Sequence, residues 1–157
     1  MNDSDKLPKG KYDPVKILST GDSFFKAAER CNEQRPIPTG NFEWLLVPMI
    51  VNRTLSCELF IKAILLYHGK ASSGHDLCAL WDQLPQEVQS KIKQVCHYNQ
   101  DSIFVNKLAE IALAFKEWRY VYEYEKGTID IQFLEILATA LKEVSHEIVK
   151  YPITSNT

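Results

Sequence analysis

The residues of this sequence best suited to binding or chemistry are concentrated in 114–127, AFKEWRYVYEYEKG. This stretch holds one Trp, three Tyr, one Arg, two Lys and three Glu. It is too aromatic for an ordinary exposed helix end and too charged for a buried one. Helical spacing places Phe115, Trp118 and Tyr122 on one face, which we expect to be core.

The remaining residues of this aromatic segment form two further stripes. Arg119 and Glu123 lie four apart and can pair, while Tyr120 and Tyr124 form a third stripe. Arginine beside tyrosine hydroxyls suits recognition of a phosphate or a base. It suits a dimer interface equally well, because Tyr, Trp and Arg dominate interface hot spots. A core stripe beside a surface ion pair is the simpler interpretation, and all three stay open.

A second polar set interrupts the most apolar helical stretch of the chain. Asn52, Arg53 and Ser56 share one helical neighbourhood. Glu58 and Lys62 are four apart with Glu first, which is the favoured order for a helical ion pair. These residues form either a solvated strip with a surface ion pair or a polar groove between long helices.

Other chemistries lack the spacing they require. No His pair at i, i+4 and no closely spaced Cys pair occurs, so the sequence predicts no metal site. No glycine-rich phosphate loop or nucleophile elbow occurs either, and we expect no cofactor. The side chains considered as metal ligands are His68, His75, Asp76, Cys78, Cys96 and His97.

Composition favours one globular domain. The chain has 157 residues, 45% hydrophobic and 24% charged, with a net charge of -2. The chain has no overall basic excess of the kind that indicates nucleic-acid binding. The N-terminal stretch is polar, and the longest apolar run is shorter than a membrane span, so we predict a cytoplasmic protein without membrane insertion. The four cysteines are predicted to be buried and reduced.

Hydrophobic periodicity predicts helices throughout and no strand. Asp13 and Pro14 start the first helix, which Gly21 is expected to split. Asn41 is expected to cap a long helix that Pro48 kinks and Gly69 ends. The further helices are predicted over 75–85, 86–98, 103–127 and 131–151.

These elements predict an all-α bundle of about five to six helices around two or three long ones. Residues 1–12 are expected to form a flexible lead, 13–151 the single helical domain and 152–157 a tail.

Three segments, in this order, resemble the HEPN domain, an all-α family named for higher-eukaryote and prokaryote nucleotide binding. They are SCELFIKAILLYHG with its Glu58–Lys62 step, GHDLCALWDQLP with its Gly-His-Asp-Leu helix start, and FKEWRYVYE with Arg119. The resemblance covers about residues 42 to 150. It implies metal-independent RNA cleavage in toxin–antitoxin and phage-defence systems, or a binding role beside a nucleotidyltransferase. It also implies a homodimer.

The RNases of that family carry Arg, four to six residues, then His. Arg119 matches the Arg, but Tyr124, Glu125 and Lys126 occupy the three positions where His could stand. Tyrosine, with a pKa near ~10, is a poor general base at neutral pH.

The leading hypothesis is therefore a noncatalytic or divergent HEPN-like module that binds a nucleotide, RNA or a protein such as an antitoxin or nucleotidyltransferase. The alternative is a divergent metal-independent RNase that uses Arg119 with Tyr124 or a residue of a second protomer. The expected functional surface consists of Glu58, Lys62, Arg119, Tyr120 and Glu123.

Overall fold

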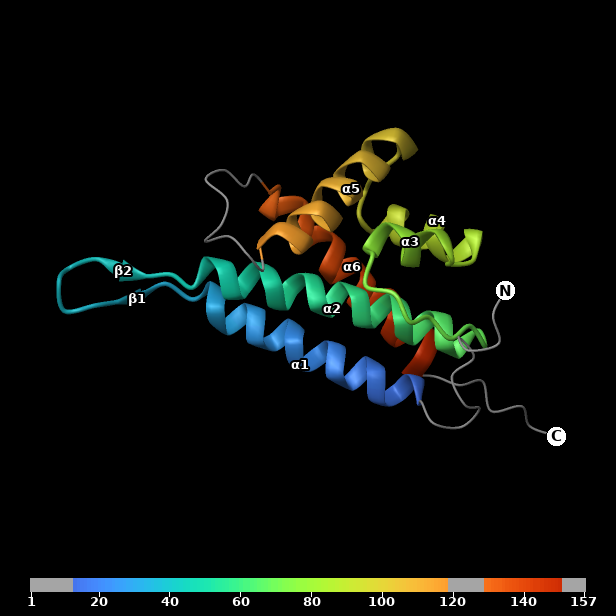
Figure 1. The fold of residues 1–157 in the computed structure, drawn as a ribbon, viewed down its shortest axis with the longest axis horizontal. Helices are drawn as coiled ribbons and strands as arrows, with labels where there is room; N and C mark the ends of the chain where they lie inside the picture. Colours follow the sequence, from blue (N-terminus) through green and yellow to red (C-terminus); the bar gives the residue numbers. More distant parts are fainter. Residues whose placement is uncertain (1–12, 119–128, 151–157) are drawn as a thin grey trace.

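The computed structural model describes residues 13–118 and 129–150 of the chain. Within these ranges it contains six helices and one short antiparallel hairpin (Figure 1), which confirms the predicted all-α bundle. The predicted lead at 1–12 and tail at 152–157 lie outside the described residues. The elements are α1 (Pro14–Asn32), β1 (Arg35–Pro36), β2 (Phe42–Glu43), α2 (Leu46–Tyr67), α3 (Leu77–Asp82), α4 (Gln86–Val95), α5 (Asp101–Trp118) and α6 (Ile131–Lys150).

Helix α1 starts where the sequence predicts but is not split. The Asp13 side chain accepts a hydrogen bond from the Val15 N–H at 2.9 Å, and Pro14 occupies the first helical position. Gly21 is buried within the continuous helix, facing Phe60 of α2. The predicted break at Gly21 is wrong because the absence of a Cβ there allows close helix packing, which outweighs the low helix propensity of glycine.

The start of α2 also differs from the prediction. Residues Phe42 and Glu43 pair with β1 instead of continuing a helix capped by Asn41, and α2 begins only at Leu46. Pro48 thus falls in the first turn, where its missing N–H removes no intrahelical hydrogen bond and no kink is required. The hairpin is favoured because two prolines in 35–40 exclude a helix there, and its turn carries the chain back toward α1.

Helix α2 ends as predicted at Gly69. Gly69 has a φ of 78°, which an L side chain rarely adopts. Its N–H donates to the Leu66 carbonyl, and the Lys70 N–H donates to the Leu65 carbonyl at 2.8 Å. These two bonds satisfy carbonyls that the helix end leaves free.

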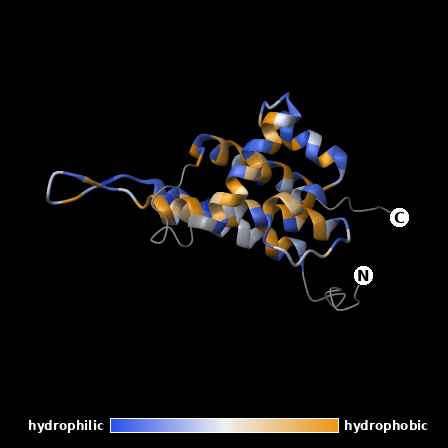
Figure 2. Ribbon diagram, turned by 45° about the horizontal axis from the view of Figure 1, so that its top comes forward, coloured by the Kyte–Doolittle hydropathy of each residue, from blue (hydrophilic) through white to orange (hydrophobic). Residues whose placement is uncertain are grey.

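Helix α2 is the centre of the bundle. It contacts α1, α3, α5 and α6, and Figure 1 shows α1 alongside it. Figure 2 shows hydrophobic turns concentrated in the helical body. Among the described residues, no helix combines the length and apolar character needed to cross a bilayer. The buried residues of α2 are Met49, Ile50, Arg53, Thr54, Ser56, Cys57, Glu58, Phe60, Ile61, Ala63, Ile64 and Leu65.

The last helix begins after Asp130, as the sequence predicts. One oxygen of Asp130 accepts from the Phe133 N–H at 2.9 Å, and the other pairs with Lys107 of α5. This carboxylate therefore joins α5 to the start of α6. The Lys107 ammonium and the Phe133 N–H hold the pKa of Asp130 below its ordinary value. The hydrogen bond to Asp130 raises the pKa of Lys107.

Replacing Gly21 by alanine should destabilise the fold although it improves helix propensity. A Cβ at this position would lie 2.8 Å from Cε1 of Phe60. We expect the free energy of unfolding to fall by about 1–3 kcal/mol, as for other overpacked cores. In a Phe60→Leu background the same substitution should be neutral or stabilising. Urea denaturation of the four proteins tests this, and a more stable single variant would contradict it.

Asp130→Asn should change how stability depends on pH while retaining a capping side chain. Because folding lowers the pKa of Asp130, its contribution is present at neutral pH and is lost as pH falls below about 4. Because folding raises the pKa of Lys107, the pair also weakens as pH rises above about 10. The stability difference between wild type and variant should therefore be largest between these limits. A constant difference from pH 2 to 7 would exclude this role.

Candidate functional site

The polar residues of α2 do not form a solvated strip. Arg53 is 2% exposed, Ser56 0% and Glu58 4%, so they lie inside the bundle. They belong to two separate clusters, one around Arg53 and one around Glu58. These clusters differ because the described polar contacts of Arg53 lie within the fold, whereas one carboxylate oxygen of Glu58 has no hydrogen-bond partner among the described residues.

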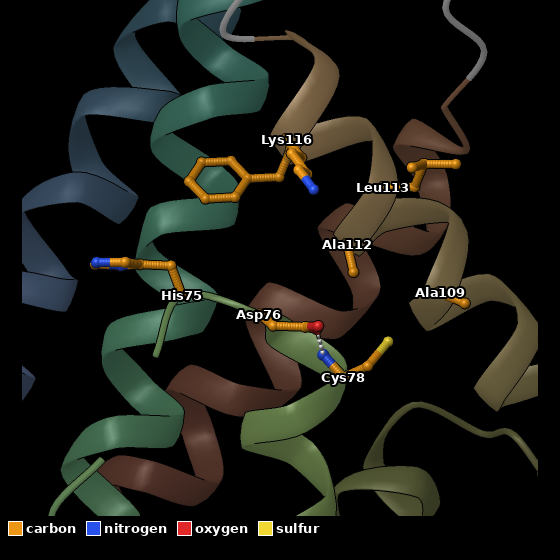
Figure 3. A pocket seen from close by; sticks show the side chains of 8 residues that line it. His75, Asp76, Cys78, Ala109, Ala112, Leu113 and Lys116 are labelled. Carbon is orange, nitrogen blue, oxygen red and sulfur yellow. Dashed lines mark hydrogen bonds between the residues drawn. The ribbon is translucent and has the colours of Figure 1, made fainter. Parts of the chain in front are cut away.

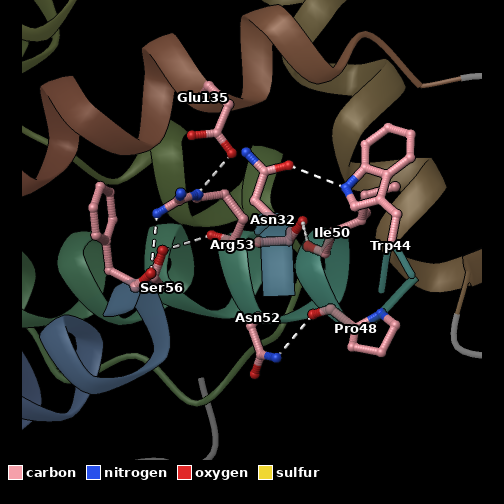
Figure 4. A network of polar contacts seen from close by, with 10 residues as sticks. Asn32, Trp44, Pro48, Ile50, Asn52, Arg53, Ser56 and Glu135 are labelled. Carbon is pink, nitrogen blue, oxygen red and sulfur yellow. Dashed lines mark hydrogen bonds and ion pairs between the residues drawn. The ribbon is translucent and has the colours of Figure 1, made fainter. Parts of the chain in front are cut away.

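The Arg53 cluster is structural (Figure 4). Arg53 Nε donates to Glu135 Oε1 of α6 at 2.9 Å, and Nη1 donates to the Phe25 carbonyl of α1 at 3.1 Å. The guanidinium carbon also lies 4.0 Å from the centroid of the Phe25 ring. Ser56 Oγ donates to the Arg53 carbonyl at 2.6 Å. Arg53 therefore joins three helices and is not presented to a ligand.

The Glu58 cluster confirms the helical pair with Lys62 and adds a histidine. Glu58 Oε1 accepts from Lys62 Nζ at 2.7 Å and from His75 Nδ1 at 2.9 Å. The side chains are 5% exposed for Glu58, 15% for Lys62 and 71% for His75. The second oxygen, Oε2, is buried and has no hydrogen-bond partner among the described residues. An unsatisfied buried acceptor is costly and marks a site that a donor can stabilise.

Local structure explains why His75 reaches Glu58. The chain turns at Gly69, runs as an irregular segment over 70–76, and enters α3 at Asp76. Asp76 caps α3 by accepting from the Cys78 N–H at 2.9 Å and the Ala79 N–H at 3.3 Å. This cap fixes the residue before it, so His75 is held over α2.

Each donor to Glu58 lines a different cavity. His75 and Asp76 line a cavity of about 490 Å³ between the start of α3 and the C-terminal half of α5 (Figure 3). Lys62 lines a cavity of about 360 Å³ together with Ser72 and Ser73. The Glu58 carboxylate therefore connects the walls of two cavities. The larger cavity is lined by His75, Asp76, Cys78, Ala109, Ala112, Leu113, Phe115 and Lys116.

The larger cavity has His75 and Lys116 at its wall but no reactive thiol. The His75 ring points toward α2 and away from Lys116 (Figure 3). The carboxylate accepts from His75 Nδ1, so Nε2 is the ring nitrogen left for a ligand. Lys116 is exposed at the α5 wall. Burial raises the pKa of the Cys78 thiol, and the charges of Asp76 and Asp82 raise it further. Cys78 is thus a protonated thiol at neutral pH and a weak nucleophile.

The buried thiols of Cys57 and Cys96 are also unreactive. Burial raises the pKa of Cys96 to about 12 and also raises that of Cys57. In the ranges 13–118 and 129–150, no three His, Cys, Asp or Glu side chains are grouped as a metal site requires. The geometry therefore favours noncovalent binding or proton transfer at His75.

The predicted site residues fall into two groups. Glu58 and Lys62 are brought together, as their spacing predicts. Arg119, Tyr120, Glu123 and Tyr124 all lie outside the described residues, so their roles stay predictions.

His75 and Lys116 enter the site only through the tertiary structure. The sequence shows His75 in a helix-start motif and Lys116 in the aromatic segment. Neither pattern indicates contact with Glu58 or a shared cavity, because the cavity depends on how α5 packs beside α3.

Replacing Glu58 by alanine should lower the free energy of unfolding by about 3 kcal/mol, because it leaves the largely buried Lys62 ammonium without its counterion. His75→Ala should cost less than about 1 kcal/mol, since His75 is mostly exposed. The double variant with Glu58→Ala and Lys62→Ala should lose less unfolding free energy than the sum of the losses in the two single variants. Urea denaturation at pH 7 of the three single variants and the double variant measures these free energies. Equal effects of Glu58→Ala and His75→Ala would contradict a buried carboxylate centre.

Comparison with protein-family models, with curated protein sequences and with solved structures finds no match to this chain.

Proposed function

We propose that this chain is a HEPN-like helical binding module whose ligand is a nucleotide, held in the cavity between α3 and α5. The observation that carries the proposal is the Glu58 centre. A buried carboxylate fixes His75 at the wall of a cavity that also has an apolar side and a lysine.

The cavity has the size and the apolar wall that a nucleobase requires. Its volume of about 490 Å³ falls within the range of small-molecule sites. Ala109, Ala112 and Leu113 supply one apolar side from α5, and the buried Phe115 lies at the same wall. Leu113 is 57% exposed, so its side chain is accessible to a ligand.

The charged groups favour a phosphate on the same ligand. Lys116 lines the cavity and can donate to an anionic oxygen, and His75 can do so through Nε2 when both of its ring nitrogens are protonated. Asp76 is the acidic residue of this lining, and its Oδ1 is engaged by two backbone N–H groups of α3. An apolar wall suits a nucleobase, and a cation suits a phosphate. A ligand that carries both groups, such as a nucleotide, therefore fits the cavity better than an apolar metabolite does.

The proposal also gives the aromatic segment a role. Lys116 precedes Arg119 by three residues, and α5 ends at Trp118. Arg119 is the next residue of the sequence and lies outside the described residues. An arginine suits recognition of a phosphate chain or of the backbone of single-stranded RNA.

Isothermal titration calorimetry with adenosine and guanosine monophosphates tests the proposal. A mononucleotide should bind more tightly than inorganic phosphate or the nucleoside alone. Lys116→Ala and His75→Ala should each weaken binding about tenfold, as expected for losing one charge-assisted contact. Lys26→Ala, an exposed lysine of α1 on another face, is the matched control and should have no effect.

Two outcomes would overturn this assignment. Equal affinity of wild type and Lys116→Ala for every mononucleotide would exclude the cavity as the site. Cleavage of mixed RNA that survives a chelator and is lost in Arg119→Ala would instead indicate the divergent RNase.

A further inference from the structure

The β1–β2 hairpin is an arm that makes few contacts with the helical body within the described residues. Figure 1 shows it extending beyond the N-terminal end of α2, away from the helical body. The arm is held by its own bonds: Ile37 N–H donates to the Asn41 carbonyl at 2.9 Å, and Gly40 N–H donates to the Ile37 carbonyl at 3.0 Å. At its base, Trp44 Nε1 donates to Asn32 Oδ1 at 3.2 Å (Figure 4).

The pairing register determines which backbone groups of the arm are free. Pro36 lies opposite Phe42, and Arg35 lies opposite Glu43. Proline has no N–H, and the bond from Ile37 to Asn41 flanks this pair, so Pro36 and Phe42 form a non-hydrogen-bonded pair. In an antiparallel ladder such residues direct their N–H and C=O outward. Phe42 therefore presents a free donor and a free acceptor on the outer edge of β2.

The two outer edges of the ribbon are not equivalent. The edge of β1 carries Pro36, with Pro38 two residues later, and proline protects an edge from pairing because it cannot donate. β2 has no proline, and exposed apolar side chains lie in it and directly after it. Phe42 is 65% exposed, Trp44 43% and Leu45 46%. A two-stranded ribbon is marginal in water, so an added strand on this edge would stabilise the arm.

We propose that β2 pairs with β2 of a second copy of this chain, in an antiparallel arrangement about a twofold axis at Phe42. The two Phe42 residues would exchange two backbone hydrogen bonds, and four strands would form one sheet. Glu43 would then lie opposite Asn41 of the second copy, a compatible carboxylate–amide pair. An axis at Glu43 would instead place two carboxylates directly opposite one another, which is unfavourable.

Symmetry explains why the occupant is a second copy and why assembly stops at two. An isologous contact uses the same patch on both chains, and the open edge of β2 complements itself. After pairing, both outer edges of the sheet are the proline-bearing β1 strands, so no third copy can add. This interface uses none of the residues around Glu58, so it stands apart from the proposed ligand site.

Sedimentation equilibrium on the full chain tests the interface. Wild type should dimerise, and Phe42→Pro should raise the dimer dissociation constant at least about tenfold because it removes the outward N–H. Gln34→Pro is the matched control, since it places proline on the opposite edge after an extended Glu33 with ψ 123°. It should dimerise like wild type. A monomeric wild type, or a Phe42→Pro variant that dimerises unchanged, would overturn the proposal.

Cysteine cross-linking gives a test that does not depend on weakening the dimer. Residues in a hydrogen-bonded antiparallel pair have Cα atoms about 5.5 Å apart, within disulfide range. Phe42→Cys should therefore form a disulfide-linked dimer on oxidation, and Glu43→Cys should not. Wild type controls for the four native cysteines. Cross-linking of Glu43→Cys in place of Phe42→Cys would overturn the proposed axis.

Discussion

The burial of Arg53 is the constraint on which the arrangement of the long helices depends. A guanidinium cannot lose its charge in a protein, so burying it requires partners for its donors. Glu135 of α6 and the carbonyl and ring of Phe25 in α1 supply them. Because all three groups must meet on one face of α2, this cluster selects one relative placement of α1, α2 and α6. Purely apolar packing would distinguish such placements less sharply.

Glu58 lies about one and a half turns further along α2 and is treated differently by the fold. One of its oxygens receives two donors, and the other has no partner among the described residues. A buried carboxylate in this state holds Lys62 and His75 in place while leaving binding capacity unused. Arg53 joins helices of the bundle, whereas Glu58 holds side chains that line cavities. Both residues belong to the polar set that interrupts the apolar sequence of α2.

The arm and the ligand cavity lie at different parts of the molecule and follow different physical rules. The cavity lies between the start of α3 and the C-terminal half of α5, whose side chains line a space that they do not fill. The arm exists because prolines in 35–40 exclude a helix, and its two edges differ in their ability to donate.

The sequence by itself determined the helical class, the starts of α1, α3, α4 and α6, and the ion pair of Glu58 with Lys62. These features depend on bonds within a few residues, such as the caps at Asp13, Asp76 and Asp130, which local residue type predicts well.

Only the tertiary structure decided that Gly21 continues α1, that 42–43 forms a strand, and that His75 joins Glu58. Arg53 and Glu135 are 82 residues apart in the chain, and helical spacing carries no information about such a pair. Which faces meet depends on how whole helices pack, where the close approach of Gly21 to Phe60 outweighs local propensity.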